Sequence, residues 1–215
     1  MTRAFVFDLD GVLLDSEQVW NEAKEQVVRE RGGRWRDDAP RQMMGMSSPE
    51  WARYLREELG VDLDLDAISD EVVRRMERIY RAELPLIDGA TEAVERLAGS
   101  APLGLASSSN REIIDLFLEL TGLGPRFAAT ISSEEVDRGK PAPDVYLEVL
   151  RRMDADPARS AAVEDSENGI RAAKAAGMRV LALPNPHYPP DPAAVAAADD
   201  LLGSLHELTV ERAFR

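Results

Sequence analysis

Five short apolar runs are spread along the chain, each only a few residues long and rich in small, β-branched or aromatic side chains. Runs of this length that stop at Gly, Pro or polar residues are typical of buried β-strands. The expected strands cover residues 4–7, 103–106, 129–132, 161–163 and 180–183.

Helical spacing separates the later strands. Ile113, Leu116, Phe117 and Leu120 recur at the i, i+3, i+4 and i+7 positions of one helix face. A strand followed by a helix, repeated along the chain, predicts right-handed βαβ units. We therefore expect an α/β fold with a Rossmann-like parallel sheet and helices on both of its faces.

The segment after the first strand breaks this alternation, because its pattern predicts helices only. The expected helices cover residues 17–31, 49–59 and 67–83, with Gly32 and Gly60 where helix C-caps belong. About 70 residues of helix is too long for an ordinary crossover between parallel strands. The segment is therefore predicted to be a separate unit.

This prediction divides the chain into two domains. Residues 1–14 and 86–215 form the α/β core, and residues 15–85 form an inserted helical cap domain. Residues 15–16 and 85–89, where the chain leaves the core and returns, are the expected hinges. A proline-rich segment at residues 184–192 is expected to be a surface loop without helix, since proline restricts the backbone to extended conformations.

Composition narrows the function class. Hydrophobic residues make up 44% and charged residues 31%, as in soluble globular proteins, and no cysteine is present for a disulfide or a thiol nucleophile. A net charge of −14 opposes binding to nucleic acid or to an anionic membrane. The N-terminal apolar run is interrupted too early for a signal peptide. We expect a cytoplasmic monomer or weak homodimer that acts on a small molecule.

Polar side chains come after four of the predicted strands. In a parallel sheet the carboxyl ends of the strands meet at one edge, where ligands bind. The candidates are Asp8, Asp10, Ser107, Lys140, Glu164 and Asp165.

The four carboxylates of this set predict a metal site. Asp8 and Asp10 would repel each other unless a cation lies between them. Together with Glu164 and Asp165 they supply hard oxygen ligands, which suit Mg²⁺. A turn before Gly11 is the simpler explanation for two aspartates, but turn geometry does not need both carboxylates.

A run of hydroxyl and amide side chains, Ser107 to Asn110, precedes a predicted helix. Free backbone N–H groups and a hydroxyl at a helix N-terminus can bind phosphate, so Ser107 and Ser108 are candidate phosphate ligands, with Ser109 or Asn110 as the helix cap. Lys140 lacks the sequence context of a P-loop lysine. Its position after a strand still favours a phosphate contact over ordinary solvent exposure.

Taken together, these residues resemble the four motifs of the haloacid dehalogenase superfamily, in the family's order. The motifs are Asp8-Leu9-Asp10-Gly11, Ser107, Lys140-Pro141 and Glu164-Asp165-Ser166. The position of the insertion resembles the helical-cap subfamily that includes β-phosphoglucomutase and sugar-phosphate phosphatases.

The resemblance implies roles for these residues. Asp8 would be the nucleophile that forms an aspartyl-phosphate, and Asp10 the general acid and base. Ser107 and Lys140 would bind phosphate. Asp8, the Asp10 carbonyl, Glu164 and Asp165 would hold Mg²⁺. The second acid, Asp10, separates this chain from true haloacid dehalogenases, which lack it.

The cap decides between phosphatase and mutase. β-Phosphoglucomutases carry a His after the first motif and a Lys and an Arg around a Gly in the cap. The corresponding positions here are Trp20, with Met44 and Ser48 around Gly45. Without cap cations the second phosphate of a bisphosphate would lack partners. We therefore expect a phosphatase acting on a hexose or hexitol phosphate, with a phosphomutase as the alternative.

These cap residues, together with Asn110 from the core, are expected to face the substrate, although plain packing between cap and core would also explain Trp20 and Met44. A phospho-accepting signalling domain also gathers Asp, Ser and Lys at strand ends. It would place its acceptor Asp on an interior strand and has no use for a helical insertion.

Overall fold

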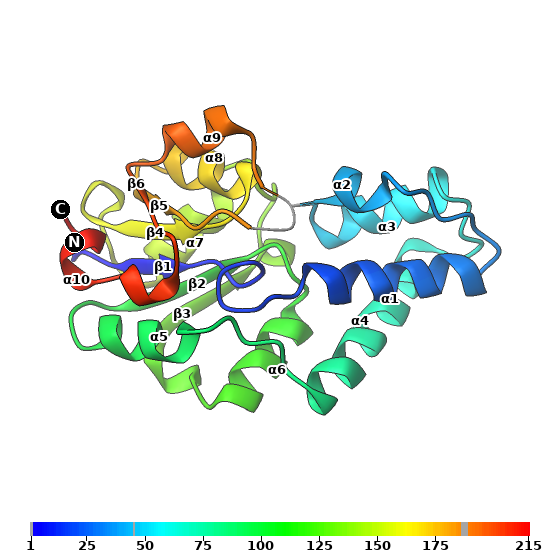
Figure 1. Ribbon diagram of the computed structural model, residues 1–215, viewed down its shortest axis with the longest axis horizontal. Helices are drawn as coiled ribbons and strands as arrows, with labels where there is room; N and C mark the ends of the chain where they lie inside the picture. The colour runs from blue at the N-terminus through cyan, green and yellow to red at the C-terminus, as the bar shows by residue number, and fades with distance from the viewer. Residues whose placement is uncertain (1, 45, 186–188) are drawn as a thin grey trace.

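The computed structural model describes residues 2–44, 46–185 and 189–215 of the protein. At its centre is a parallel sheet with strand order β3-β2-β1-β4-β5-β6. The strands are β1 (Phe5–Phe7), β2 (Leu103–Ser107), β3 (Phe127–Ser132), β4 (Ala161–Glu164), β5 (Arg179–Ala182) and β6 (Asp200–Leu201). The N-terminal strand lies inside the sheet, so the residues that follow it reach the middle of the sheet's carboxyl edge (Figure 1).

Helices cover both faces of this sheet. Phe5 and Phe7 point into the apolar cluster beneath α5 and α6, whereas Val6 belongs to the cluster beneath α7 and α8. These helices are α5 (Ala90–Ala98), α6 (Arg111–Thr121), α7 (Asp144–Arg152) and α8 (Glu167–Ala175). Because alternate side chains of a strand point to opposite faces, both faces need an apolar cover. The predicted α/β fold is confirmed.

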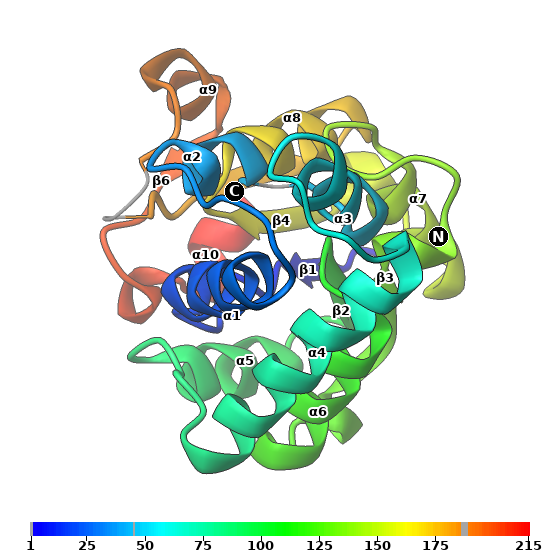
Figure 2. The same ribbon diagram turned by 90° about the vertical axis from the view of Figure 1, so that its right-hand side faces the viewer.

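Four helices follow β1 before the chain returns to the sheet. They are α1 (Glu17–Glu30), α2 (Ala39–Met43), α3 (Ser48–Glu57) and α4 (Leu65–Ala82). Helices α1 and α3 pack against α4, which also contacts α6. The group projects beyond the sheet in Figure 1 and stands in front of it in Figure 2. Three of these helices were predicted; α2 was missed because one and a half turns give no readable periodicity.

The two connections between this helical group and the sheet lie side by side. Leu14 and Leu86 form an antiparallel bridge. The Asp15 N–H donates to the Pro85 carbonyl at 2.8 Å, and the Ile87 N–H donates to the Leu13 carbonyl at 3.0 Å. The outgoing and returning segments therefore support each other at the predicted crossing point. The division into core and cap domains stays a prediction.

The proline-rich segment corrects one expectation. A helix, α9 (Pro192–Ala197), begins at its last proline, with the Asp191 carboxylate accepting a hydrogen bond from Ala193 N at 2.7 Å. Proline suits the first helical position because its missing N–H has no partner there. Pro186 lies outside the described residues.

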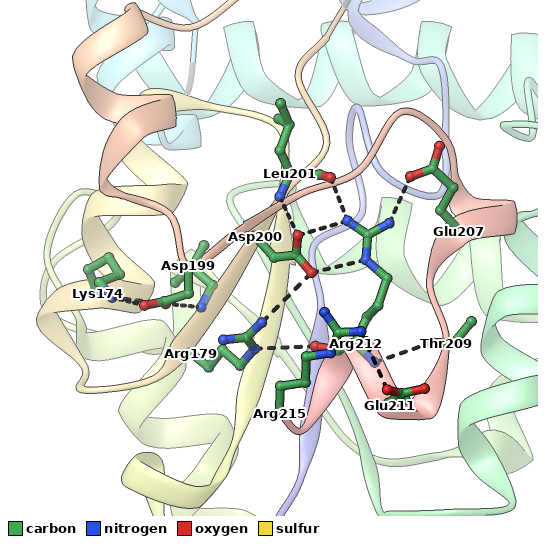
Figure 3. Close-up of polar contacts among 11 residues, drawn as sticks. Lys174, Arg179, Asp199, Asp200, Leu201, Glu207, Thr209, Glu211, Arg212 and Arg215 are labelled. Atoms are coloured by element: carbon green, nitrogen blue, oxygen red, sulfur yellow. Dashed lines mark hydrogen bonds and ion pairs between the residues drawn. The ribbon is translucent and has the colours of Figure 1, made fainter.

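After α9 the chain adds a sixth strand, β6, which was not predicted because it has only two residues. A short final helix, α10 (Val210–Ala213), carries Arg212, whose guanidinium binds the Asp200 carboxylate through Nε at 3.0 Å and Nη2 at 2.7 Å (Figure 3). Arg212 also pairs with Glu207 at 2.8 Å. This network holds the C-terminal segment against the sheet edge. In the described part of the chain no helix is both long and apolar enough to cross a membrane.

Candidate active site

The carboxyl end of β1 carries the first candidate residues. Asp8 follows the strand directly, and its N–H donates to the Val163 carbonyl of β4 at 3.2 Å. The chain then turns at Gly11, whose φ is +76°. A Cβ at Gly11 would lie 1.9 Å from Asp165 Oδ2. Only glycine allows this turn and this close approach, which brings the β1 loop against the aspartate that follows β4.

Three buried carboxylates meet at this point. Asp8, Glu164 and Asp165 each offer an oxygen, and these oxygens lie within 4.8 Å of one another. The Lys140 Nζ lies 2.9 Å from Asp8 Oδ1 and 2.6 Å from Glu164 Oε1. It also donates to the Ala106 carbonyl at 3.1 Å. The cluster thus holds three carboxylates and one ammonium, which contacts two of them.

The charge imbalance is visible in the pKa values. Burial, with the charge of Glu164, raises the pKa of Asp8 to about 8 although Lys140 opposes the shift. Burial and the charge of Glu164 raise the pKa of Asp165 well above its ordinary value. Burial alone would lower the pKa of Lys140, but Asp8 and Glu164 raise it above its ordinary value. A divalent cation would neutralise the excess negative charge, and the all-oxygen donor set fits Mg²⁺.

Glu164 is the most tightly held member of the cluster. Its Oε1 accepts from Lys140 and from the Tyr146 hydroxyl at 2.5 Å, and its Oε2 accepts from Ser166 Oγ at 3.2 Å. A Cβ at Gly169 would lie 1.9 Å from Oε2. The first turn of α8 therefore packs directly on this carboxylate and fixes its orientation.

Asp10 has different surroundings from Asp8. Its Oδ1 accepts from Ser16 Oγ at 2.5 Å and from the Trp20 indole N–H at 2.9 Å. Its Oδ2 accepts from Ser109 Oγ and, at 3.4 Å, from Ser107 Oγ. The Asp10 side chain is not among the three carboxylates that come together. Its carboxylate instead bridges the helical group and the β2–α6 loop.

The serine run after β2 leads to the expected helix cap. Asn110 is the N-cap residue of α6, as predicted, but neither it nor Ser109 caps that helix with its side chain. Glu134 accepts the Arg111 N–H at 2.9 Å instead. Ser107 is fully buried and its Oγ accepts from the Ser109 N–H at 3.0 Å.

A pocket lies between this edge of the sheet and the helical group. Its core-side lining is made of Asp8, Asp10, Ser108, Ser109, Lys140, Asp165 and Ser166. Its opposite wall is made of Glu17, Trp20, Lys24, Met43, Met46 and Trp51. A small molecule inside would therefore touch the acidic cluster at one end and helices α1–α3 at the other.

The comparisons with known proteins agree with this geometry. Residues 2–177 match the family described as haloacid dehalogenase-like hydrolase. The chain belongs to that family.

Named relatives include hexitol phosphatase B of Escherichia coli K12, which is 34% identical over 97% of this chain and 95% of its own length. A phosphorylated carbohydrates phosphatase of Thermotoga maritima is 33% identical over 82% of each chain. CbbY of Rhodobacter sphaeroides, solved as a variant with xylulose 1,5-bisphosphate, superposes with a TM-score of 0.87, at 26% identity and covering 100% of both chains.

Within this hydrolase family the expected cap residues lie in several places. Trp20 lines the pocket, whereas Met44 borders a different hollow, beside Arg41 and Pro189. Gly45 lies outside the described residues. Ser48 donates to Asn110 Oδ1 at 2.7 Å, and neither residue lines the pocket, so these two connect the helical group to the core.

One expectation about the cap is wrong. The wall of the pocket opposite the acidic cluster does carry a cation, Lys24, which is absent from the predicted site. Glu17, Trp20 and Lys24 are spaced i, i+3 and i+7, so they share one face of α1. That periodicity was available in the sequence. Met43, Met46 and Trp51 had no comparable signal, because their approach depends on how α1 and α3 pack.

Proposed function

We propose that the chain is a Mg²⁺-dependent phosphatase that hydrolyses a small sugar phosphate through an aspartyl-phosphate intermediate. It is a phosphoric monoester hydrolase, the class to which its named relatives belong. The observation that carries the proposal is the pairing of Asp8 with Lys140 and an acidic cluster at the bottom of a pocket. That combination provides a nucleophile, a phosphate-binding cation and metal ligands at one point.

The first step transfers the phosphoryl group to the enzyme. An Asp8 oxygen forms a bond to phosphorus while the bond to the ester oxygen breaks, and the Asp10 carboxyl gives its proton to that oxygen, which leaves as an alcohol. Lys140, Ser107, Ser108 and the backbone amides of the loop would hold the phosphoryl oxygens.

The second step releases phosphate. Water attacks the phosphorus and gives a proton to the Asp10 carboxylate. The bond from phosphorus to Asp8 breaks, and inorganic phosphate and the free Asp8 carboxylate result. Ser16, Trp20 and Ser109 each donate a hydrogen bond to the Asp10 carboxylate. These bonds hold the carboxylate in one position for both proton transfers.

Asp8, Glu164, Asp165 and the Asp10 carbonyl would hold the Mg²⁺ ion. When bound, it would neutralise charge on the phosphoryl oxygens and on the cluster. The raised pKa of Asp8 supports a bound cation at this point, because a neutral carboxyl is a poor nucleophile and a cation would favour the ionised form.

A phosphomutase is the second candidate, and Lys24 is the observation that favours it. A cation opposite the catalytic aspartates could hold the second phosphate of a bisphosphate, and CbbY was solved with such a ligand. The nearby carboxylates of Glu17 and Asp10 offset its charge, however. This balance favours a neutral sugar end over a second phosphate.

The test is a phosphate-release assay on hexose and hexitol phosphates, with Mg²⁺ and with excess EDTA. We expect release with Mg²⁺ and none with EDTA. Activity that survives chelation would refute the metal assignment. Incubation with β-glucose 1-phosphate should give free phosphate; conversion to glucose 6-phosphate would establish the mutase instead.

A further inference from the structure

Lys24 has an unusual environment for a lysine. It is 6% exposed, and its Nζ lies 5.2 Å from the ring centroid of Trp20 and 5.2 Å from that of Trp51. Among the residues that the structure describes, its ammonium forms no hydrogen bond and no ion pair. The residue nevertheless lines the pocket that holds Asp8 and Asp10.

Packing alone does not explain a lysine at this position. A buried ammonium has lost water, and the faces of two indole rings return only part of that free energy. Burial accordingly lowers the pKa of Lys24 to about 8, although the charges of Glu17 and Asp10 oppose the shift. An unbranched apolar side chain would fill the same space without this cost. A partner for the ammonium is therefore expected from the pocket itself.

The neighbourhood of Lys24 indicates what that partner is. Glu17, half-buried two turns earlier on the same face of α1, lines the pocket and interacts with Lys24 through its charge. The pair offers one group that donates and one that accepts, as vicinal hydroxyls require. Burial and the charge of Asp10 raise the pKa of Glu17 to about 7 although Lys24 opposes the shift, so the pocket already disfavours negative charge at this point. A second phosphate would add negative charge beside the carboxyl groups of Glu17 and Asp10, with one ammonium to balance it.

We propose that Lys24 is the residue that determines specificity, by donating hydrogen bonds to hydroxyl oxygens of a polyhydroxylated leaving group while Glu17 accepts from a neighbouring hydroxyl. The inference rests on the proposed function, because it assumes that the phosphate of the same molecule lies beside Asp8 and Lys140. The ligand class is a phosphomonoester of an uncharged sugar or sugar alcohol.

The experiment compares Lys24→Met with the wild type on two esters in the presence of Mg²⁺. Sorbitol 6-phosphate carries the hydroxyls, and p-nitrophenyl phosphate has none. Loss of a charge-assisted hydrogen bond should lower kcat/KM for sorbitol 6-phosphate about 10- to 100-fold more than for p-nitrophenyl phosphate. The matched control is Lys174→Met, since Lys174 pairs with Asp199 away from the pocket and should change neither value.

Equal losses on both esters, or no loss on sorbitol 6-phosphate, would overturn the inference and leave the phosphatase intact. If the wild type releases phosphate from neither ester, the proposed function fails, and the inference with it.

A binding measurement separates a neutral ligand from a bisphosphate. In the Asp8→Asn background, Lys24→Met should weaken calorimetric binding of sorbitol 6-phosphate more than that of inorganic phosphate. A larger effect on xylulose 1,5-bisphosphate than on sorbitol 6-phosphate would assign Lys24 to a second phosphate and overturn the neutral ligand class.

Discussion

At the scale of single residues, Asp8 and Asp10 have the same side chain and opposite surroundings. Asp8 is buried among carboxylates and one lysine, whereas Asp10 accepts hydrogen bonds from three serines and a tryptophan. The first environment suits a nucleophile that works beside a cation. The second suits a group that moves a proton while its position stays fixed.

Replacement of the nucleophile is the most direct prediction. Asp8→Asn should lower phosphate release by a factor on the order of 10³ or more, because an amide cannot form the aspartyl-phosphate. Circular dichroism and thermal melting should show that the fold is kept. Asp37→Asn, an exposed change between α1 and α2, is the control and should leave activity unchanged. Substantial residual turnover by Asp8→Asn would remove Asp8 from this role.

Lys24 also predicts a dependence of stability on pH. The pKa of this lysine falls from 10.5 in the unfolded chain to about 8 in the fold, so below pH 8 folding must bury a charge. Lys24→Met should therefore raise the free energy of unfolding at pH 7 by about 2–3 kcal/mol.

Between about pH 8 and 10.5 the unfolded chain binds the extra proton, so the wild type gains stability relative to the variant as the pH rises. Urea denaturation at pH 7 and pH 10 measures the difference, which should shrink at the higher pH. A variant that is less stable at pH 7 would contradict the argument.

At the scale of elements, side chains link the helical group to the core at several points, among them the Arg81–Glu119 ion pair at 3.1 Å between α4 and α6. Two further links lie close to the site. Trp20 on α1 donates to Asp10 at 2.9 Å. Asn110, at the N-terminus of α6, accepts from Ser48 at 2.7 Å and donates to Ser69 at 3.1 Å and Glu134 at 2.8 Å. The first link reaches the catalytic loop, and the second holds α3 and α4 against the core.

Trp20→Phe tests the first link, because it keeps an aromatic ring and removes the donor to Asp10. The loss should impair protonation of the leaving group, so kcat for a sugar phosphate should fall about 5- to 20-fold. The fall for p-nitrophenyl phosphate should be smaller, because its leaving group needs less protonation. Trp35→Phe, on a tryptophan outside the pocket, is the control. Equal falls on both esters would indicate a packing role.

Asn110→Ala tests the second link. Its side chain is almost fully buried, and its loss removes one hydrogen bond each from Ser48, Ser69 and Glu134. We expect the free energy of unfolding to fall by about 2–3 kcal/mol, measured by urea denaturation. Ser69→Ala removes a single hydrogen bond and should cost less. Equal stability of Asn110→Ala and the wild type would show that this contact does not hold the helical group against the core.

At the scale of the whole molecule, the acidic site adds to a net charge of −14. An anionic substrate is repelled by the overall field, so the local cations and a bound metal must draw it in. The same repulsion among Asp8, Glu164 and Asp165 opposes folding when no cation is present.

Millimolar Mg²⁺ should therefore raise the thermal melting temperature by several degrees, because it binds the folded chain and not the unfolded one. EDTA should reverse the increase, and NaCl at equal ionic strength should not reproduce it. Asp165→Asn should melt higher than the wild type without metal and lose most of the Mg²⁺ response. An equal Mg²⁺ response in this variant would place the ion elsewhere.

The core of this protein was readable from its sequence. Five of its strands and three helices of the helical group follow from periodicity. That Asp8, Lys140, Glu164 and Asp165 lie together follows from the rule that parallel strands end at one edge. Such patterns are local. The order of the strands, with β1 between β2 and β4, then brings the residues that follow these strands together. The α2 helix and strand β6 escaped because they are too short to carry a pattern.

The opposite wall of the pocket was decided by tertiary structure. Trp51 reaches this wall because α3 packs against α4, which also packs against α1, and its ring centroid lies 6.1 Å from that of Trp20. Ser48 and Asn110 meet although they lie 62 residues apart. The place of Lys24 on one face of α1 could be predicted from its spacing. Its burial beside two indole rings could not, because α3 supplies the second ring. Sequence determines which face a side chain occupies; burial, and with it the chemistry of that side chain, depends on what packs against the face.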